Sequence, residues 1–156
     1  MRKKATPTIT VIFTLFLPVA ISLSQGFSSP AITFERYKRA IAKGDVEAYL
    51  KCLTRESLAL LQGNRPPRSL LKKEYKNIAG KEYFIQVKEK MAIVLFKRNT
   101  PYEAPYLLLK ENNEWKIDLK GMSEKIFFDA EKKWHLLGEE KITVKIPKEE
   151  DKKEKK

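Results

Sequence analysis

The stretch from Phe34 to Leu53 most constrains the fold, because two helical patterns meet in it at a glycine–aspartate pair. Gly44 can adopt the positive φ that ends a helix, and the Asp45 side chain can accept hydrogen bonds from the free N–H groups of the next helix. Apolar residues at helical spacing form one face on each side of this junction: Phe34, Tyr37, Ala40 and Ile41 before it, and Val46, Tyr49, Leu50 and Leu53 after it. Two helices this short leave their apolar faces uncovered, so a later part of the chain must pack on them.

The N-terminal segment has the features of an export signal. An uncharged apolar stretch, Ile9–Leu23, follows the basic residues Arg2, Lys3 and Lys4. This stretch is as long as a signal-peptide core and shorter than the roughly 20 residues of a bilayer-spanning helix. The small residues near its end place the cleavage after Gly26, with Ser24 as the second candidate. We therefore expect residues 1–26 to be a signal peptide and the protein to be periplasmic or secreted; the alternative is an anchor formed by the uncleaved segment.

The rest of the chain suits one domain and a charged tail. About 130 residues follow the cleavage site (156 − 26), and a domain of that size buries roughly two thirds of its unfolded surface. We assign residues 27–146 to this domain and residues 147–156, a mixture of lysine and acid, to a disordered tail. The formal net charge is +12 and the signal segment supplies three of it, so nine positive charges remain (12 − 3) and favour anionic surroundings.

Cysteine and histidine are too few for a disulfide or a metal site. Cys52 is the only cysteine, so no disulfide can form within the chain. We interpret it as a half-buried structural thiol, with an intermolecular bridge or a reactive thiol as the alternative. One histidine and one cysteine far apart give no metal-ligand cluster, and the sequence contains neither a glycine-rich phosphate loop nor a G-x-S-x-G elbow. We therefore expect no metal, no cofactor and no catalytic residue.

Two further helices are predicted before the chain changes to strands. Thr54 can cap the third helix, and the segment Gly63–Pro67 must end it because consecutive prolines lack N–H donors. Ser69 begins the fourth helix, and Gly80 ends it. The apolar residues of these two helices are Leu58, Leu60, Leu61, Leu70, Leu71, Tyr75 and Ile78.

From Lys81 onwards, apolar residues recur at every second position, which is the period of a half-buried strand. The first strand carries Tyr83, Ile85 and Val87. Met91–Phe96 is apolar on both faces, as is typical of a central strand covered on two sides. Tyr106–Lys110 and Trp115–Leu119 follow, joined by a turn at residues 111–114. We expect these four segments to form an antiparallel meander.

The C-terminal part is predicted to add a helix and a strand. The helix begins at Ser123 and ends at Gly138, and its apolar side consists of Ile126, Phe127, Ala130, Trp134 and Leu137. A last strand then carries Ile142, Val144 and Ile146 before Pro147 opens the tail.

The order of these segments resembles that of exported NTF2-like proteins, the cystatin-like α+β family that includes SnoaL-like and lumazine-binding-like members. The matching segments cover roughly residues 31–119: Tyr37, Ala40-Ile41 and Gly44-Asp45, the strand Ala92-Ile93-Val94, and Leu107–Lys110 leading through Asn113-Glu114 to Trp115-Lys116-Ile117. The resemblance implies an NTF2-like cone, in which N-terminal helices pack on a strongly curved antiparallel sheet and leave a pocket. The helix and strand after Ser123 are additional to the family pattern.

Five aromatic residues are candidates to line this pocket with polar tips: Tyr37, Tyr49, Tyr83, Tyr106 and Trp115. The alternative is that they fill the core, because a small domain needs its large side chains for packing. Two titratable residues are weaker candidates. His135 is interpreted as a solvated surface residue of the C-terminal helix, and alternation places Asp118 on the solvent face of its strand, opposite Trp115.

We expect an exported, noncatalytic binding or interaction module of the cell envelope. Its partner would be a small apolar molecule in the cone or an envelope protein on the sheet, and relatives often form homodimers through that sheet. Export argues against nucleic acid as a partner. One alternative is an isomerase- or hydrolase-like enzyme that uses a pocket carboxylate, which rests on fold analogy. The other is a basic adaptor for anionic envelope surfaces, which would use the densest basic group: Arg65, Arg68, Lys72 and Lys73.

Overall fold

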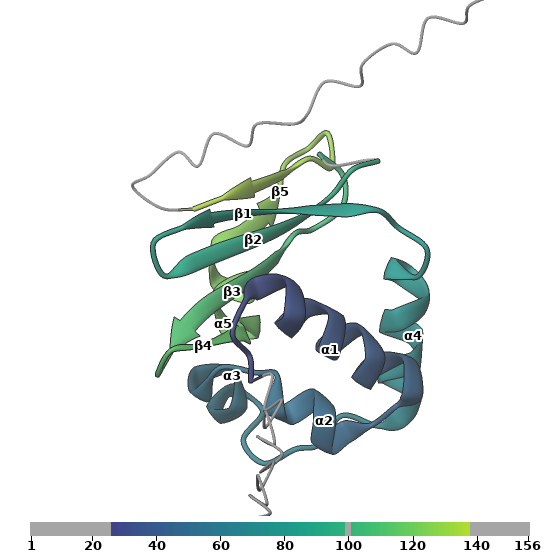
Figure 1. Cartoon of the computed structure of the whole chain (residues 1–156). Helices are drawn as coiled ribbons and strands as arrows, with labels where there is room; N and C mark the ends of the chain where they lie inside the picture. The colour runs from purple at the N-terminus through teal and green to yellow at the C-terminus, as the bar shows by residue number, and fades with distance from the viewer. Residues whose placement is uncertain (1–25, 99–100, 138–156) are drawn as a thin grey trace, which may run out of the picture.

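The computed structural model describes residues 26–98 and 101–137, and in this part the chain is α+β. Four helices come first: α1 Pro30–Lys43, α2 Val46–Lys51, α3 Arg55–Leu60 and α4 Arg68–Ile78. The elements that follow are β1 Tyr83–Lys88, β2 Met91–Phe96, β3 Tyr106–Glu111, β4 Glu114–Ile117, α5 Leu119–Lys125, β5 Ile126–Phe128 and β6 Trp134–Leu136 (Figure 1). Most of the predicted signal peptide, the strand predicted around Val144 and the charged tail lie outside the described residues.

The corner between α1 and α2 confirms the prediction from the sequence. Gly44 adopts a φ of 66°, and the N–H of Asp45 donates to the Ala40 carbonyl over 2.9 Å, which closes the last turn of α1. The Asp45 carboxylate then accepts a hydrogen bond of 3.0 Å from the N–H of Ala48 and so caps α2. A left-handed glycine and an adjacent capping aspartate are therefore sufficient to turn the chain here.

Replacing Asp45 by alanine is expected to lower the free energy of unfolding by about 1 kcal/mol, because the N–H of Ala48 loses its side-chain acceptor. Urea unfolding measures this change. Asp45→Asn keeps a capping oxygen and serves as the control, with a much smaller loss expected. Unchanged stability in Asp45→Ala, combined with weaker ligand binding, would assign this residue to a binding role instead of a cap.

The next two helices also begin close to their predicted starts. Thr54 caps α3 as expected, because its Oγ1 accepts a hydrogen bond of 3.1 Å from the N–H of Ser57. The predicted start of α4 at Ser69 is one residue late, since the helix begins at Arg68 and Pro67 occupies the capping position in an extended conformation. Proline fits there because the first helical N–H groups have no partner within the helix.

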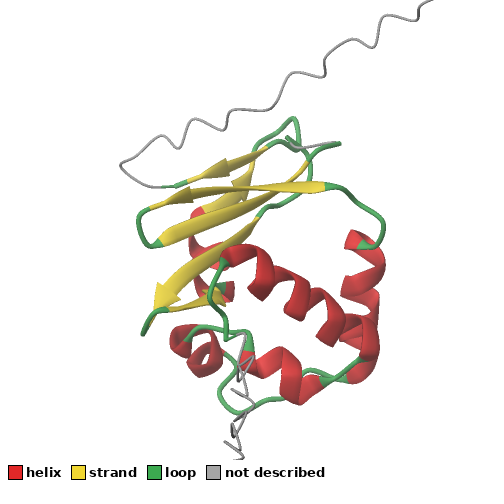
Figure 2. Ribbon diagram, viewed as in Figure 1, coloured by secondary structure: helices red, strands yellow, loops and turns green. Residues whose placement is uncertain are grey.

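The sheet is the predicted meander, with strand order β1-β2-β3-β4 and antiparallel pairing throughout. Alternation along β2 sends Ala92, Val94 and Phe96 into a core with α1, α2 and α4, and sends Ile93 and Leu95 into a second core on the other face. Figures 1 and 2 show the long helices α1 and α4 gathered on one side of the sheet, with the β5–β6 hairpin on the other. Strand β2 is therefore covered on two sides, as its apolar sequence predicts.

The outer edge of β4 is covered by backbone from the N-terminal half of the chain. Leu53 forms a parallel bridge with Ile117, whose N–H donates to the Cys52 carbonyl over 2.7 Å. Further along the same edge, the N–H of Trp115 donates to the carbonyl of Phe27 over 2.7 Å. These bonds occupy groups that an open edge strand would expose. They also hold Phe27 and Cys52 at one end of the helical layer.

The helix predicted to begin at Ser123 is wrong in both its start and its extent. The helix α5 spans Leu119–Lys125, and the chain beyond it forms the hairpin β5–β6, with Phe127 paired to His135. Asp129 organises the hairpin turn, because its Oδ1 accepts bonds of 2.9 Å from the N–H groups of Glu131 and Lys133. Within the described residues, a short helix and a hairpin thus take the place of the predicted helix, and the added strand around Val144 lies outside them.

The reason for this error lies in the second core. Helical spacing groups Ile126 with Phe127 and Ala130, whereas strand alternation groups Ile126 with Trp134 and Leu136 across the hairpin. Without a cover, the sheet face of Ile93, Leu95 and Leu107 would be exposed to water, and Ile126, Trp134 and Leu136 bury it together with Phe84 and Met122. Burial against a face formed by distant residues therefore selects the strand pattern.

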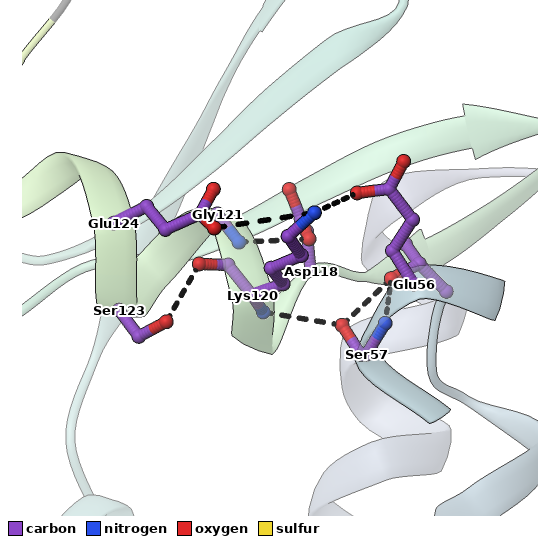
Figure 3. Close-up of polar contacts among 8 residues, drawn as sticks. Glu56, Ser57, Asp118, Lys120, Gly121, Ser123 and Glu124 are labelled. Atoms are coloured by element: carbon purple, nitrogen blue, oxygen red, sulfur yellow. Dashed lines mark hydrogen bonds and ion pairs between the residues drawn. The ribbon is translucent and has the colours of Figure 1, made fainter. Parts of the chain in front are cut away.

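The predicted position of Asp118 is also wrong, because this residue is buried and does not lie on a solvent-exposed face of the strand. The strand ends at Ile117, and Asp118 caps α5 through a hydrogen bond of 3.0 Å from the N–H of Gly121 to Oδ1 (Figure 3). A Cβ at Gly121 would collide with the Asp118 carboxylate, so a larger residue here would have to displace the capping side chain. The start of α5 is held to α3 by the 3.0 Å ion pair between Lys120 and Glu56.

Candidate binding site

Four of the five predicted pocket residues form an aromatic cluster around Phe34. The Phe34 ring lies 4.9 Å from that of Tyr83 and 5.2 Å from that of Tyr106, while Tyr37 lies 5.6 Å from both Tyr106 and Tyr49. Phe34, Tyr37, Tyr49 and Tyr106 are buried between the helices and the sheet, and Tyr83 is half-buried at the margin. Trp115 is also buried, on β4 in the same core. Packing therefore engages all five predicted residues.

The tyrosine hydroxyls of this cluster donate to two glutamates that the sequence reasoning missed. Tyr37 and Tyr106 both donate to the same oxygen of Glu74 on α4, the latter over 2.9 Å. Tyr83 donates to Glu35 on α1 over 2.6 Å. The separations along the chain are 37, 32 and 48 residues, so no local pattern could have revealed them. The tips of three candidate pocket residues thus have partners inside the protein.

Electrostatics keeps these tyrosines protonated. Burial raises the pKa of Tyr37 and Tyr106 well above the ordinary tyrosine value, and the nearby Glu74 carboxylate raises both further. Burial also raises the pKa of Tyr83, as does its bond to Glu35. For Glu35, burial acts to raise the pKa, but the hydrogen bonds from Tyr83 and Lys38 outweigh it and lower the pKa overall. The cluster therefore consists of neutral donors facing carboxylate acceptors.

A cavity of about 260 Å³ opens beside the corner between α1 and α2. None of the five predicted aromatic residues lines it. Four cationic side chains do so, over a floor that contains Phe27 and Cys52; we call this site the basic groove, and its lining residues are Phe27, Arg36, Arg39, Ala40, Lys43, Asp45, Ala48, Lys51 and Cys52. Arg36, Arg39 and Lys43 lie three and four residues apart on α1, which puts them on the side that turns toward α2. Lys51 comes from the last turn of α2.

The basic groove has a strong imbalance of charge. Asp45 is the one carboxylate among the described residues that line it, and an oxygen of that carboxylate caps α2. The Arg36 guanidinium lies 5.0 Å from the centre of the Phe27 ring, and the Lys116 Nζ lies 3.6 Å from the same ring centre. Lys116 is paired with Glu114 at 2.8 Å. The groove therefore presents a net positive field above an apolar floor.

A second cavity, of about 560 Å³, lies on the other side of the same corner. Its lining residues are Lys43, Gly44, Asp45, Val46, Glu47, Arg65 and Arg68. Arg65 forms an exposed ion pair with Glu47. Of the basic group predicted from the sequence, Arg65 and Arg68 line this cavity, whereas Lys72 and Lys73 are exposed on α4. The sequence thus predicted the part of the basic surface formed by Arg65 and Arg68, but not the part on α1. The helical spacing of the arginines and the lysine on α1 could have revealed that second part.

Cys52 at the floor of the basic groove is a structural thiol, more deeply buried than the half-buried residue that the sequence suggested. Its Sγ donates to the Ala48 carbonyl over 3.2 Å, and 1% of the residue is exposed. Burial raises its pKa to about 11. Such a thiol is a poor nucleophile at neutral pH.

His135 lies on the surface, as predicted, but on strand β6 rather than on a helix. Its Nε2 is 2.6 Å from the Asp129 Oδ2, and this hydrogen bond lowers the pKa of Asp129. Within residues 26–98 and 101–137, no group of three His, Cys, Asp or Glu side chains is placed to hold a metal ion. In the same residues, no helix has the length and apolar character that crossing a bilayer requires.

A separate cavity of about 340 Å³ lies where α4 leads into β1, next to the start of the β2–β3 loop. Its charged lining residues are Lys81, Glu82, Arg98 and Glu103, and Lys81 pairs with Glu103 at 3.0 Å. Two cations and two acids select neither sign of charge, in contrast to the basic groove.

Comparisons with protein-family models, with curated proteins and with solved structures gave no significant match, so the NTF2-like resemblance stays a prediction.

Proposed function

We propose that this protein is an exported, noncatalytic binding module of the cell envelope, NTF2-like in its chain order, that holds anionic groups in the basic groove. The observation that carries the proposal is the convergence of Arg36, Arg39, Lys43 and Lys51 on one cavity with a single carboxylate among its described lining. Like charges brought together in a hollow repel one another, and a bound anion relieves that repulsion. The apolar floor adds a surface for the carbon skeleton that carries the anion.

The proposed ligand binds at the corner of α1 and α2, whereas the sequence predicted a ligand in the cone between the helices and the sheet. The aromatic residues expected to hold a small apolar molecule pack on one another, and three of their hydroxyls are bonded to Glu74 or Glu35. They support an apolar ligand less well than the basic groove supports an anion. The basic-adaptor alternative from the sequence is therefore the closest to the present proposal, with its site extended to α1.

A catalytic alternative would use Glu74, since two tyrosine hydroxyls donate to one of its oxygens. Both hydrogen bonds go to Oε1 of Glu74, so only the second oxygen remains to accept a proton from a substrate. Glu74 lines neither cavity at the corner of α1 and α2. Its geometry supports a structural role, in which it satisfies two buried hydroxyls between α4 and the rest of the core.

The test uses hexyl phosphate, whose phosphate suits the cations and whose short chain suits the apolar floor. Isothermal titration and NMR chemical-shift mapping are expected to show binding, with shifts concentrated at residues 36–52. Reversing two exposed lining charges, Arg39→Glu with Lys43→Glu, should weaken binding at least tenfold, about 1.4 kcal/mol. These side chains lie at the surface, so the variant is expected to fold.

The matched control reverses two exposed lysines outside the groove, Lys76→Glu with Lys110→Glu, and so changes the net charge by the same amount. Binding by the control should stay within about twofold of the original, because neither lysine lines the groove and salt screens the field of exposed charges. Equal losses in both variants would mean that net charge alone attracts the probe. No binding to the unaltered protein would reject the proposed function.

A further inference from the structure

The two cavities at the corner of α1 and α2 are parts of one surface. They share Lys43 and Asp45, and Gly44 lines the second cavity between them. Helix α4 approaches this corner so closely that a Cβ at Gly44 would lie 3.2 Å from the Cβ of Arg68. The first residue of α4 thus adjoins the last turn of α1, although 25 positions separate Lys43 from Arg68 in the sequence (68 − 43).

The joined surface carries a row of cations that is longer than one small anion. We call it the basic track, and it consists of Arg36, Arg39, Lys43, Lys51, Arg65 and Arg68. Arg36 and Lys43 alone are separated by about 10 Å along the helix axis, at 1.5 Å per residue. The second cavity extends the track beyond Lys43 toward α4. A ligand with a single charged group can therefore contact only part of it.

The acids along the basic track are already engaged. Asp45 caps α2, and Glu47 is paired with Arg65. Together they offset two of the six positive charges, which leaves an excess of four for a ligand (6 − 2). Several charges arranged in a row match a ligand that carries its own charges at intervals.

We propose that the basic track binds a linear polyanion, a polymer with a phosphate or carboxylate on successive repeats, which passes from the α1–α2 groove around Gly44 to Arg68. The inference rests on the proposed function of the basic groove and extends it. The cations continue from α1 over the α1–α2 corner to the start of α4, so a flexible chain can follow them from one charge to the next. No exposed large apolar side chain lines either cavity, so a means of insertion into lipid is absent from the described track.

The experiment measures binding of linear polyphosphates of increasing length to the full chain, with hexyl phosphate as the short reference. Affinity should rise at least tenfold from the shortest polyphosphate to those that reach Arg68, and then level off. Raising the salt concentration should weaken the long polymer more steeply than hexyl phosphate, because more ion contacts are broken. Polygalacturonate forms a parallel arm that separates carboxylate from phosphate as the preferred repeat.

The deciding variant is Arg68→Glu, which reverses an exposed charge at the first turn of α4, where an acid suits the helix N-terminus. It should weaken long polyphosphate at least tenfold while hexyl phosphate binding stays within twofold. The matched control is Lys76→Glu, in the last turn of α4, with both ligands unchanged.

The outcomes separate the two proposals. If Arg68→Glu leaves long polyphosphate binding unchanged while Arg39→Glu with Lys43→Glu abolishes it, the polymer uses the basic groove alone and the extended track is rejected. If neither variant affects any ligand, the proposed function fails as well. If vesicles of phosphatidylglycerol bind more tightly than polymers at equal charge concentration, with the same dependence on Arg68, a membrane surface replaces the polyanion.

Discussion

Replacing Phe34 by alanine is expected to lower the free energy of unfolding by about 3–5 kcal/mol, which is the usual range for removing a buried aromatic ring. Phe34 has no exposed surface, and its ring contacts those of Tyr37, Tyr83 and Tyr106. Removing it leaves a void at the centre of the aromatic cluster. Urea unfolding followed by circular dichroism measures the change.

The control is Phe128→Ala, because 49% of this phenylalanine is exposed. Its loss should remain below about 1 kcal/mol, as expected for a partly exposed side chain. The comparison also distinguishes the two interpretations of the aromatic residues. If they lined an open pocket, Phe34→Ala would cost little more than the control; a large difference supports a filled core.

Alkaline pH is expected to destabilise the protein strongly. Burial raises the pKa of Cys52 from 9.0 to about 11, and burial also raises the pKa of Tyr37, Tyr49 and Tyr106 above 10.0. The folded state thus keeps protons that the unfolded chain releases. This contribution to stability is fully present below about pH 9 and is lost as the pH rises, because the unfolded state then binds fewer protons. For Cys52 alone the loss amounts to at most about 3 kcal/mol, at 1.4 kcal/mol per pKa unit.

Urea unfolding at pH 8, 10 and 11 measures this loss, and ultraviolet absorption follows tyrosinate formation. We expect tyrosinate from the buried tyrosines to appear together with unfolding. The variant Tyr106→Phe removes one of the titrating groups, so its stability should fall less steeply with pH. Ionisation of Tyr37, Tyr49 and Tyr106 near pH 10 in a protein that is still folded would contradict the burial of the cluster.

Local patterns in the sequence predicted most of the secondary structure for identifiable reasons. Gly44 and Asp45 specify the corner between α1 and α2, since one supplies the left-handed conformation and the other the capping oxygen. The change from helical to strand spacing after Lys81 predicted the meander, and the wholly apolar β2 predicted a strand with both faces covered. These features depend on residues within one or two turns of one another, which a sequence displays directly.

The candidate site was only partly visible for the opposite reason. The spacing of Arg36, Arg39 and Lys43 on one side of α1 can be read from the sequence, but their proximity to Arg68 depends on how α4 packs beside the corner. The bonds from Tyr37 and Tyr106 to Glu74 likewise join α1 and β3 to α4. Long-range contacts of this kind leave no periodicity in the chain.

The region after Ile117 shows where local patterns become insufficient. Capping chemistry and periodicity are consistent with a helix from Ser123, yet Asp118 caps an earlier helix and residues 126–136 form a hairpin. The amino-acid order alone specified the α1–α2 corner, the meander and the excess of positive charge. The tertiary structure decided two features. Burial of Ile93, Leu95 and Leu107 favours the strand pattern over the helix pattern in the C-terminal part, and the packing of α4 beside the corner brings the cations of the basic track together. Both depend on free energy gained from contacts between residues that are distant in the sequence.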